Sequence, residues 1–301
     1  MNQSKICCYN RPEAAAQEEF IAALSNELLN RRSDELEIEI GEVLKNNGIR
    51  KESCIIRPKG CRTAPVLYPE DFYPDYRSGR FTVSQLADRM LEMGLRKTSS
   101  AAFGPENLDR YEDVRGRILP RLINAEKNIG QLENVPYVPV EDLAVVFYYS
   151  IPDQILPGGS FLIRNEEACH WKVQTEQLYQ DAVKGGQKLR PLWLGGIGEI
   201  LGISDCGSDM LTILTNTEKA FGASAILYPA TPEILKQRMG GDFYLLPSSV
   251  HELLLVSGDF AQPDELRKMV REVNRQEVAP EEVLSDNVYL YDIHGRDFHL
   301  V

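Results

Sequence analysis

Four residues of the types that catalyse acyl transfer lie close together in the last third of the sequence: Ser248, Ser249, His251 and Glu252. Serine, histidine and a carboxylate are the components of an activated nucleophile. Their spacing argues against that chemistry, because triad members normally come from separate segments and the Gly-x-Ser-x-Gly nucleophile elbow is absent. The pattern from Ser249 to Glu252 matches a capping box, in which both side chains satisfy backbone N–H groups of one helical turn. We therefore predict a structural role, with a binding site or a hydrolase-type site as alternatives.

A second polar group follows an apolar run. Asn124, Glu126 and Asn128 share one face if residues 117–128 are extended. Amide and carboxylate groups beside an apolar strand can bind a ligand, but more often they satisfy the backbone of a loop. An enzyme built around Ser249 and His251 would have to bring Asn124 and Glu126 to the same place in space.

A third group is aromatic and lies between Pro65 and Gly79, in a segment whose prolines predict a loop with a short helical turn. Tyrosines in such a segment close over the edge of a core or form a recognition surface, and both roles stay open. The candidate functional surface therefore comprises Tyr68, Tyr73, Tyr76, Asn124, Glu126, Asn128, Ser248, Ser249, His251 and Glu252.

The strands that must position these residues follow from the pattern of apolar residues. The serines and the histidine lie in a turn between the apolar runs 243–246 and 253–256, which predict a strand, a turn and a strand. Residues 143–149 form the most continuous apolar run and predict a central buried strand. Residues 36–40 alternate between apolar residues and glutamates, and Asn46-Asn47-Gly48 predicts a hairpin with residues 49–56. The run 223–228 also predicts a strand, and residues 161–164 and 288–301 predict further hairpins.

Helical spacing of apolar residues predicts helices over residues 12–30, 82–94, 165–185, 231–239 and 263–274, with Gly94 and the pair at 185–186 as ends. The fold class is therefore α+β, with mixed, largely antiparallel sheets built from hairpins and flanked by helices. We expect an N-terminal helix-hairpin-helix subdomain over residues 1–100 and a C-terminal α+β subdomain over residues 101–301, joined by a soft boundary that also permits one domain.

The amino-acid composition limits which partners and ligands are expected. The 45 acidic and 33 basic residues give a net charge of −12, which disfavours a nucleic-acid partner and leaves a protein partner as the better expectation. The six cysteines contain no Cys-x-x-Cys pair, and the glycines at 195–198 match no phosphate-binding motif, so neither metal nor cofactor is expected. These glycines predict a flexible loop instead. The absence of a signal peptide and of an 18-residue apolar stretch predicts a cytoplasmic protein with reduced thiols and no membrane contact.

Several motifs occur once each and in the same order as in a known family. They are Asn46-Asn47-Gly48, Pro65-x-x-Tyr68, Tyr73-x-x-Tyr76-x-x-Gly79, Arg121-Leu122-Ile123-Asn124-x-Glu126-x-Asn128, residues 142–149, Leu246-Pro247-Ser248-Ser249-x-His251-Glu252 and the segment from Arg271 to Asp286. Together they resemble a bacterial family known as domain of unknown function 5688. The resemblance implies a cytoplasmic bacterial protein without an established activity, and it assigns no functional residue.

Two classes of function follow. The first is a non-enzymatic binding or regulatory module, favoured because no metal, nucleotide or nucleophile pattern is present. The second is a hydrolase-type enzyme with a site around Ser248, Ser249, His251 and Glu252. A concave pocket with serine and histidine in hydrogen-bonding contact would distinguish the enzyme from the binding module.

Overall fold

The computed structural model describes residues 11–61, 64–98, 108–155, 158–196, 211–247 and 249–301. The chain divides into two compact units, the first formed by Met1–Lys45, Arg50–Asn107 and Gln154–Leu156 and the second by Asn46–Ile49, Leu108–Asp153 and Pro157–Val301. Helices and antiparallel strand pairs occur in both, so the predicted α+β class is confirmed. The subdomains 1–100 and 101–301 stay a prediction about independent folding.

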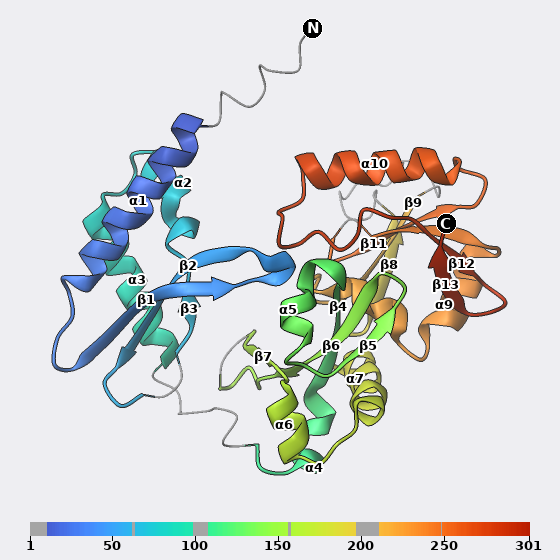
Figure 1. Cartoon of the computed structure of the whole chain (residues 1–301), viewed down its shortest axis with the longest axis horizontal. Helices are drawn as coiled ribbons and strands as arrows, with labels where there is room; N and C mark the ends of the chain where they lie inside the picture. Colours follow the sequence, from blue (N-terminus) through green and yellow to red (C-terminus); the bar gives the residue numbers. More distant parts are fainter. Residues whose placement is uncertain (1–10, 62–63, 99–107, 156–157, 197–210, 248) are drawn as a thin grey trace, which may run out of the picture. The chain divides into compact units, whose positions relative to one another are not determined.

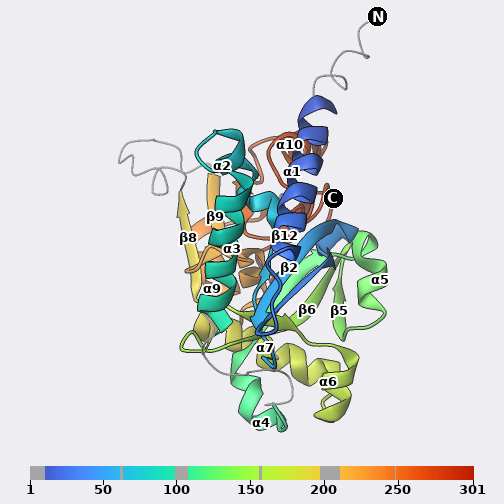
Figure 2. The same ribbon diagram turned by 90° about the vertical axis from the view of Figure 1, so that its left-hand side faces the viewer.

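The first unit is a small sheet covered on one face by two long helices. Its elements are α1 (Arg11–Leu29), β1 (Leu36–Leu44), β2 (Arg50–Pro58), β3 (Val66–Leu67), the 3-10 helix η2 (Pro69–Phe72), α2 (Tyr73–Arg77) and α3 (Val83–Thr98). Helices α1 and α3 lie side by side over the sheet (Figures 1 and 2). One apolar core joins Leu24 and Leu28 of α1 to Ile38 and Ile56 of the sheet and Met90 of α3.

The hairpin of β1 and β2 forms where the alternating pattern predicts it. The strands pair from Leu36 opposite Pro58 to Leu44 opposite Arg50. Asn47 and Gly48 between them have φ of 61° and 70°, the left-handed conformation that asparagine and glycine accept most readily. The turn is the short 3-10 helix η1 (Asn46–Gly48).

The second unit contains two antiparallel sheets. In the smaller sheet, β6 (Leu143–Ser150) is the central strand, as predicted, and it pairs with β4 (Ile118–Asn124), β5 (Tyr137–Val140) and β7 (Ser160–Leu162). The larger sheet has the order β13 (Asp297–Leu300), β12 (Tyr289–Asp292), β10 (Phe243–Leu246), β11 (Leu253–Ser257), β9 (Leu211–Asn216) and β8 (Leu192–Gly196). The predicted strand pair around residues 247–252 is therefore confirmed as β10 and β11.

Helices cover these sheets. They are α4 (Tyr111–Val114), η4 (Arg115–Arg117), η5 (Glu126–Asn128), α5 (Ile129–Leu132), α6 (Asn165–His170), α7 (Thr175–Leu189), η6 (Gly222–Leu227), α9 (Thr231–Met239) and α10 (Pro263–Gln276). Helix α7 packs on β4. Helix α10 lies over the larger sheet (Figure 1), with Leu266 and Val270 against Leu246 and Val256. In the part of the chain with described positions, no helix has the length and apolar composition to cross a membrane.

Two predictions about glycines are wrong for one physical reason. Helix α3 continues past Gly94, where a Cβ atom would approach Ile56 Cβ to 2.7 Å. Helix α7 likewise runs through Gly185 to Leu189, because a Cβ atom at Gly185 would lie 2.4 Å from the Ile118 carbonyl oxygen. These glycines let a helix approach a strand closely, and they do not end helices.

Three local predictions are also corrected. Residues 223–227 form η6 instead of a strand, and Tyr228 follows as its C-cap. A short apolar run does not distinguish a strand from a buried helical turn, because it is too short to show a period. Residues 126–128 form η5, so Asn124, Glu126 and Asn128 do not share the face of one extended strand. Gly195 and Gly196 belong to β8 and not to a loop, while residues 197–198 lie outside the described residues.

Candidate functional site

Several of the polar motif residues donate hydrogen bonds to the loop 280–285, which we call the carbonyl loop. Its six successive carbonyl oxygens each accept a hydrogen bond in the second unit: those of residues 280 and 283 from Asn47 Nδ2, 281 from Asn46 Nδ2, 282 from the Val250 N–H, 284 from Asn124 Nδ2 and 285 from Asn274 Nδ2. A loop without repetitive structure needs such donors, because a buried unpaired carbonyl destabilises the fold. The amide side chains therefore hold the backbone of this loop.

Asn124 and Asn128 are buried and fully engaged in this network. Asn124 Nδ2 donates to the Leu284 carbonyl oxygen at 3.2 Å, and its Oδ1 accepts the Lys127 N–H at 2.9 Å. Asn128 Nδ2 donates to the Asn124 carbonyl oxygen and to Asn47 Oδ1, and its Oδ1 accepts the Asn47 N–H. Glu126 is exposed at the start of η5 and lies outside this set of bonds. The structure thus supports the loop-stabilising role for both asparagines.

A half-buried carboxylate, that of Asp142, completes the network. Asp142 lies directly before β6 and accepts hydrogen bonds from Ser285 Oγ at 2.7 Å, Asn287 Nδ2 at 3.0 Å and the Tyr289 hydroxyl. Burial and the neighbouring carboxylate raise the pKa of the Tyr289 hydroxyl far above its ordinary value, so this phenol stays a hydrogen-bond donor at neutral pH. Asp142 therefore fixes the end of the carbonyl loop against β12.

The side chains of Ser249 and His251 have different hydrogen-bonding partners. Ser249 Oγ accepts the backbone N–H of His251 at 3.0 Å. The imidazole of His251 has other partners, because Nδ1 accepts the Phe221 N–H at 3.1 Å and Nε2 lies 3.3 Å from Glu282 Oε1. Both ring nitrogens thus point at groups other than Ser249. Ser248 lies outside the described residues.

The capping-box prediction is wrong in its geometry but correct in assigning Ser249 a backbone partner. Residues 249–252 form no helical turn, and Ser249 instead makes an isolated bridge with Val283. Its hydroxyl caps an N–H two residues later, which is the local turn that serine favours. Burial raises the pKa of the Glu252 carboxyl, His251 opposes that effect and Glu282 adds to it. Among the described residues, no cluster of three or more His, Cys, Asp or Glu side chains suits a metal ion.

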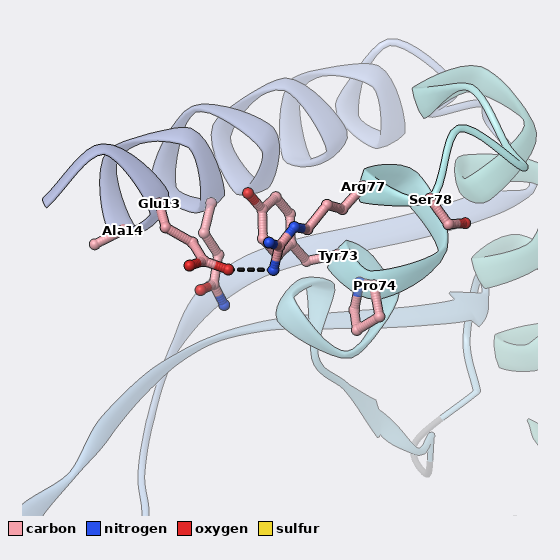
Figure 3. A pocket seen from close by; sticks show the side chains of 7 residues that line it. Glu13, Ala14, Tyr73, Pro74, Arg77 and Ser78 are labelled. Atoms are coloured by element: carbon pink, nitrogen blue, oxygen red, sulfur yellow. Dashed lines mark hydrogen bonds and ion pairs between the residues drawn. The ribbon is translucent and has the colours of Figure 1, made fainter. Parts of the chain in front are cut away.

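Tyr73 and Tyr76 lie in α2 of the first unit, where this helix packs on α1. Tyr73 lines a cavity of about 580 Å³ with Glu13, Pro74 and Arg77, and the Arg77 guanidinium reaches from α2 toward the Glu13 carboxylate of α1 (Figure 3). Tyr73 and Arg77 also line a second cavity of about 570 Å³, together with Tyr76, Arg80, Phe81, Thr82, Val83, Gln85 and Gly79. We call these two cavities with their shared wall the tyrosine corner.

The tyrosine rings of this corner pack on the edge of the core, whereas their role in recognition stays a prediction. Tyr76 stacks on Phe20 of α1 with ring centroids 4.6 Å apart, and Tyr73 packs on the same ring at 5.5 Å. Tyr76 nevertheless keeps 40% of its surface exposed, so the ring is held rigidly and still offers a contact face. Tyr68 lies away from both cavities, with Lys45 Nζ 4.0 Å from its ring centroid. Of the three tyrosines, Tyr73 and Tyr76 are therefore the ones that line these cavities.

Sequence reasoning missed one unusual group in the second unit. Arg121 interrupts the buried pattern of β4, and its guanidinium carbon lies 3.6 Å from the Tyr148 ring centroid and 3.7 Å from that of Phe221. A single charged residue inside an otherwise apolar strand was the available signal in the sequence. The sequence around Phe221 gives no comparable signal, because the position of its ring depends on a left-handed backbone conformation with φ of 53°.

The geometry defines an α+β protein whose polar motif residues stabilise a loop and which has two adjoining cavities at an aromatic corner. The chain belongs to the family of unknown function DUF5688, whose model matches residues 17–293. This match confirms the family that the motifs resemble. Neither the curated proteins nor the solved structures include a match to this chain.

Proposed function

We propose that this protein is a non-enzymatic binding module that recognises a protein partner at the tyrosine corner. The observation that carries the proposal is the placement of Tyr73, Tyr76 and Arg77 in the walls of two adjoining cavities. Tyrosine and arginine are enriched at protein interfaces, where they supply much of the binding energy. The predicted cytoplasmic localisation belongs to the same proposal.

The charges at the corner favour an acidic segment of the partner. The second cavity is lined by the guanidinium groups of Arg77 and Arg80 and by no carboxylate among the described residues. Arg77 is ion-paired with Glu13, and Arg80 lies 3.9 Å from Asp75, but both arginine side chains stay largely exposed, with 64% and 70% of their surface accessible. A partner carboxylate can therefore form charge-assisted hydrogen bonds there while neighbouring apolar side chains contact Tyr76 and Phe81. The net charge of −12 disfavours nucleic acid as the partner.

The contacts of Ser249 and His251 support a binding module over the hydrolase-type alternative. Their side chains are engaged with the backbone of His251, with Phe221 and with Glu282. Asn124 is buried beneath the carbonyl loop, and Glu126 is exposed on η5. We infer that the motif residues keep the second unit folded and that recognition belongs to the first unit.

Selection of random peptides displayed on phage against the full chain tests this proposal. We expect enrichment of sequences with Asp or Glu beside apolar residues. The selected peptides should bind at least about tenfold more weakly to the double variant R77Q/R80Q, because two charge-assisted contacts are lost. The matched control is R50Q/R96Q, which removes two exposed arginines of the same unit outside both cavities. Equal binding by wild type and R77Q/R80Q would overturn the proposal.

A further inference from the structure

Arg121 occupies a position in the second unit that restricts how its guanidinium can be contacted. Arg121 pairs with Val146 across the strands, so Tyr148 is its diagonal neighbour on the same face of the sheet. The Tyr148 and Phe221 ring centroids lie 3.6 and 3.7 Å from the guanidinium carbon. Two ring centroids this close to one atom lie on opposite faces of the planar group. Only the edge of the guanidinium, which carries its N–H donors, is left for further polar contacts.

The charge of Arg121 is not neutralised within the described chain. Nη2 donates to Ser160 Oγ at 2.8 Å, but no described carboxylate forms an ion pair with this arginine. Burial lowers the pKa of Arg121 to about 10; Tyr148 opposes that effect, and the positive charge of Arg190 adds to it. Arg121 stays protonated at neutral pH. A half-buried cation beside a second cation is unfavourable unless an anion accompanies it.

The ring that covers one face of Arg121 is held by a strained backbone. Phe221 has φ of 53° and ψ of 31°, a conformation that bulky residues rarely adopt. Its N–H donates to His251 Nδ1, and its ring packs 5.2 Å from the imidazole centroid. The next residue is pressed against β9, since a Cβ atom at Gly222 would lie 2.1 Å from Thr215 Oγ1. Strain of this kind persists where surrounding contacts fix it and is concentrated at ligand-binding sites.

We propose that Arg121 anchors a binding site for a small oxyanion, a carboxylate or a phosphate monoester, that approaches the guanidinium edge between the Tyr148 and Phe221 rings. Both anions offer two oxygens that match the parallel N–H donors of a guanidinium. Arg190, whose charge acts on Arg121, would supply a second positive charge for the anion. This site lies in the second unit and depends on none of the residues of the tyrosine corner.

Calorimetric titration of the full chain with benzoate and with phenyl phosphate, at constant ionic strength in chloride, tests the site. The two probes share an aromatic body and differ in the anion, so the tighter one identifies the ligand class. We expect saturable binding of at least one probe, weakened at least about tenfold in R121Q because charge-assisted hydrogen bonds are lost. The control R275Q makes the same change of charge at an exposed position of α10 and should bind like wild type.

Two outcomes overturn the proposal: neither probe binds saturably to wild type, or R121Q binds as tightly as wild type. If R121Q does not fold, R190Q gives the decisive result, because it removes the second charge and leaves the stacked rings in place. Weaker binding by R190Q then supports the site. Unchanged binding by a folded R190Q variant in that case contradicts it.

Discussion

Replacement of Asn124 tests whether the polar motif residues serve the fold. The side chain has 7% exposure and makes hydrogen bonds with the Leu284 carbonyl oxygen and the Lys127 N–H. Asn124→Ala leaves the buried Leu284 carbonyl unpaired, which costs about 1–3 kcal/mol, and it removes the bond to the less buried Lys127 N–H, worth about 1 kcal/mol. We expect a loss of about 2–4 kcal/mol of unfolding free energy, a large part of a total of roughly 5–15 kcal/mol. Asn124→Asp should cost at least as much at pH 7, because an oxygen then faces the Leu284 carbonyl.

Urea unfolding followed by tryptophan fluorescence measures this loss. Both tryptophans, Trp171 and Trp193, belong to the second unit, so the signal reports on the unit that contains the carbonyl loop. The matched control is Glu126→Ala, two residues away and exposed, which should change stability by less than about 0.5 kcal/mol. The structural account fails if Asn124→Ala has the midpoint and slope of wild type, since a residue kept for ligand binding would behave in that way.

Three further predictions concern single positions. Burial raises the pKa of the Glu252 carboxyl in the folded state above its ordinary value of 4.5. The protonated carboxyl therefore stabilises the folded state at pH values below 4.5, and this stabilisation is lost as the pH rises through the folded-state pKa. Glu252→Gln should therefore raise the melting temperature more at pH 7 than at pH 4, and an equal change at both would contradict the assignment. Alkylation without reductant should modify the exposed Cys169 quickly and Cys54 slowly, because burial raises the Cys54 pKa to about 12; equal rates measured by mass spectrometry would refute this. Gly185→Ala should destabilise by about 1–3 kcal/mol in thermal unfolding, because the added methyl overlaps the Ile118 carbonyl, and an unchanged melting temperature would contradict that packing.

The sequence was sufficient to predict elements whose local pattern and tertiary environment agree. The alternation of residues 36–40 and the Asn-Asn-Gly turn gave the β1 and β2 hairpin, and the apolar run from Leu143 gave the central strand β6. Gly94 and Gly185 were misread because close approach of a helix to a strand depends on a distant segment of the chain. Local pattern contains no information about that segment.

The sequence was enough to identify several residues of the candidate site, but not the contacts that these residues make. Asn124 and Asn128 were identified as polar groups beside a strand, but the loop that they hold lies about 160 residues later in the sequence. Ser249 and His251 are two residues apart in the sequence, yet the imidazole turns to Phe221 and Glu282. The sandwich around Arg121 joins two strands to a strained turn, and only its unusual charge within β4 was visible beforehand.

Binding of one selected acidic peptide to three forms of the full chain tests the central claim most directly. The forms are wild type, Arg77→Gln in the tyrosine corner and Ser249→Ala in the second unit, compared by fluorescence anisotropy under conditions where all are folded. The binding-module account predicts a dissociation constant at least about fivefold weaker for Arg77→Gln, because one charge-assisted contact is lost, and an unchanged constant for Ser249→Ala. Unchanged binding by Arg77→Gln together with lost binding by Ser249→Ala would contradict it and would place recognition at the serine and histidine turn.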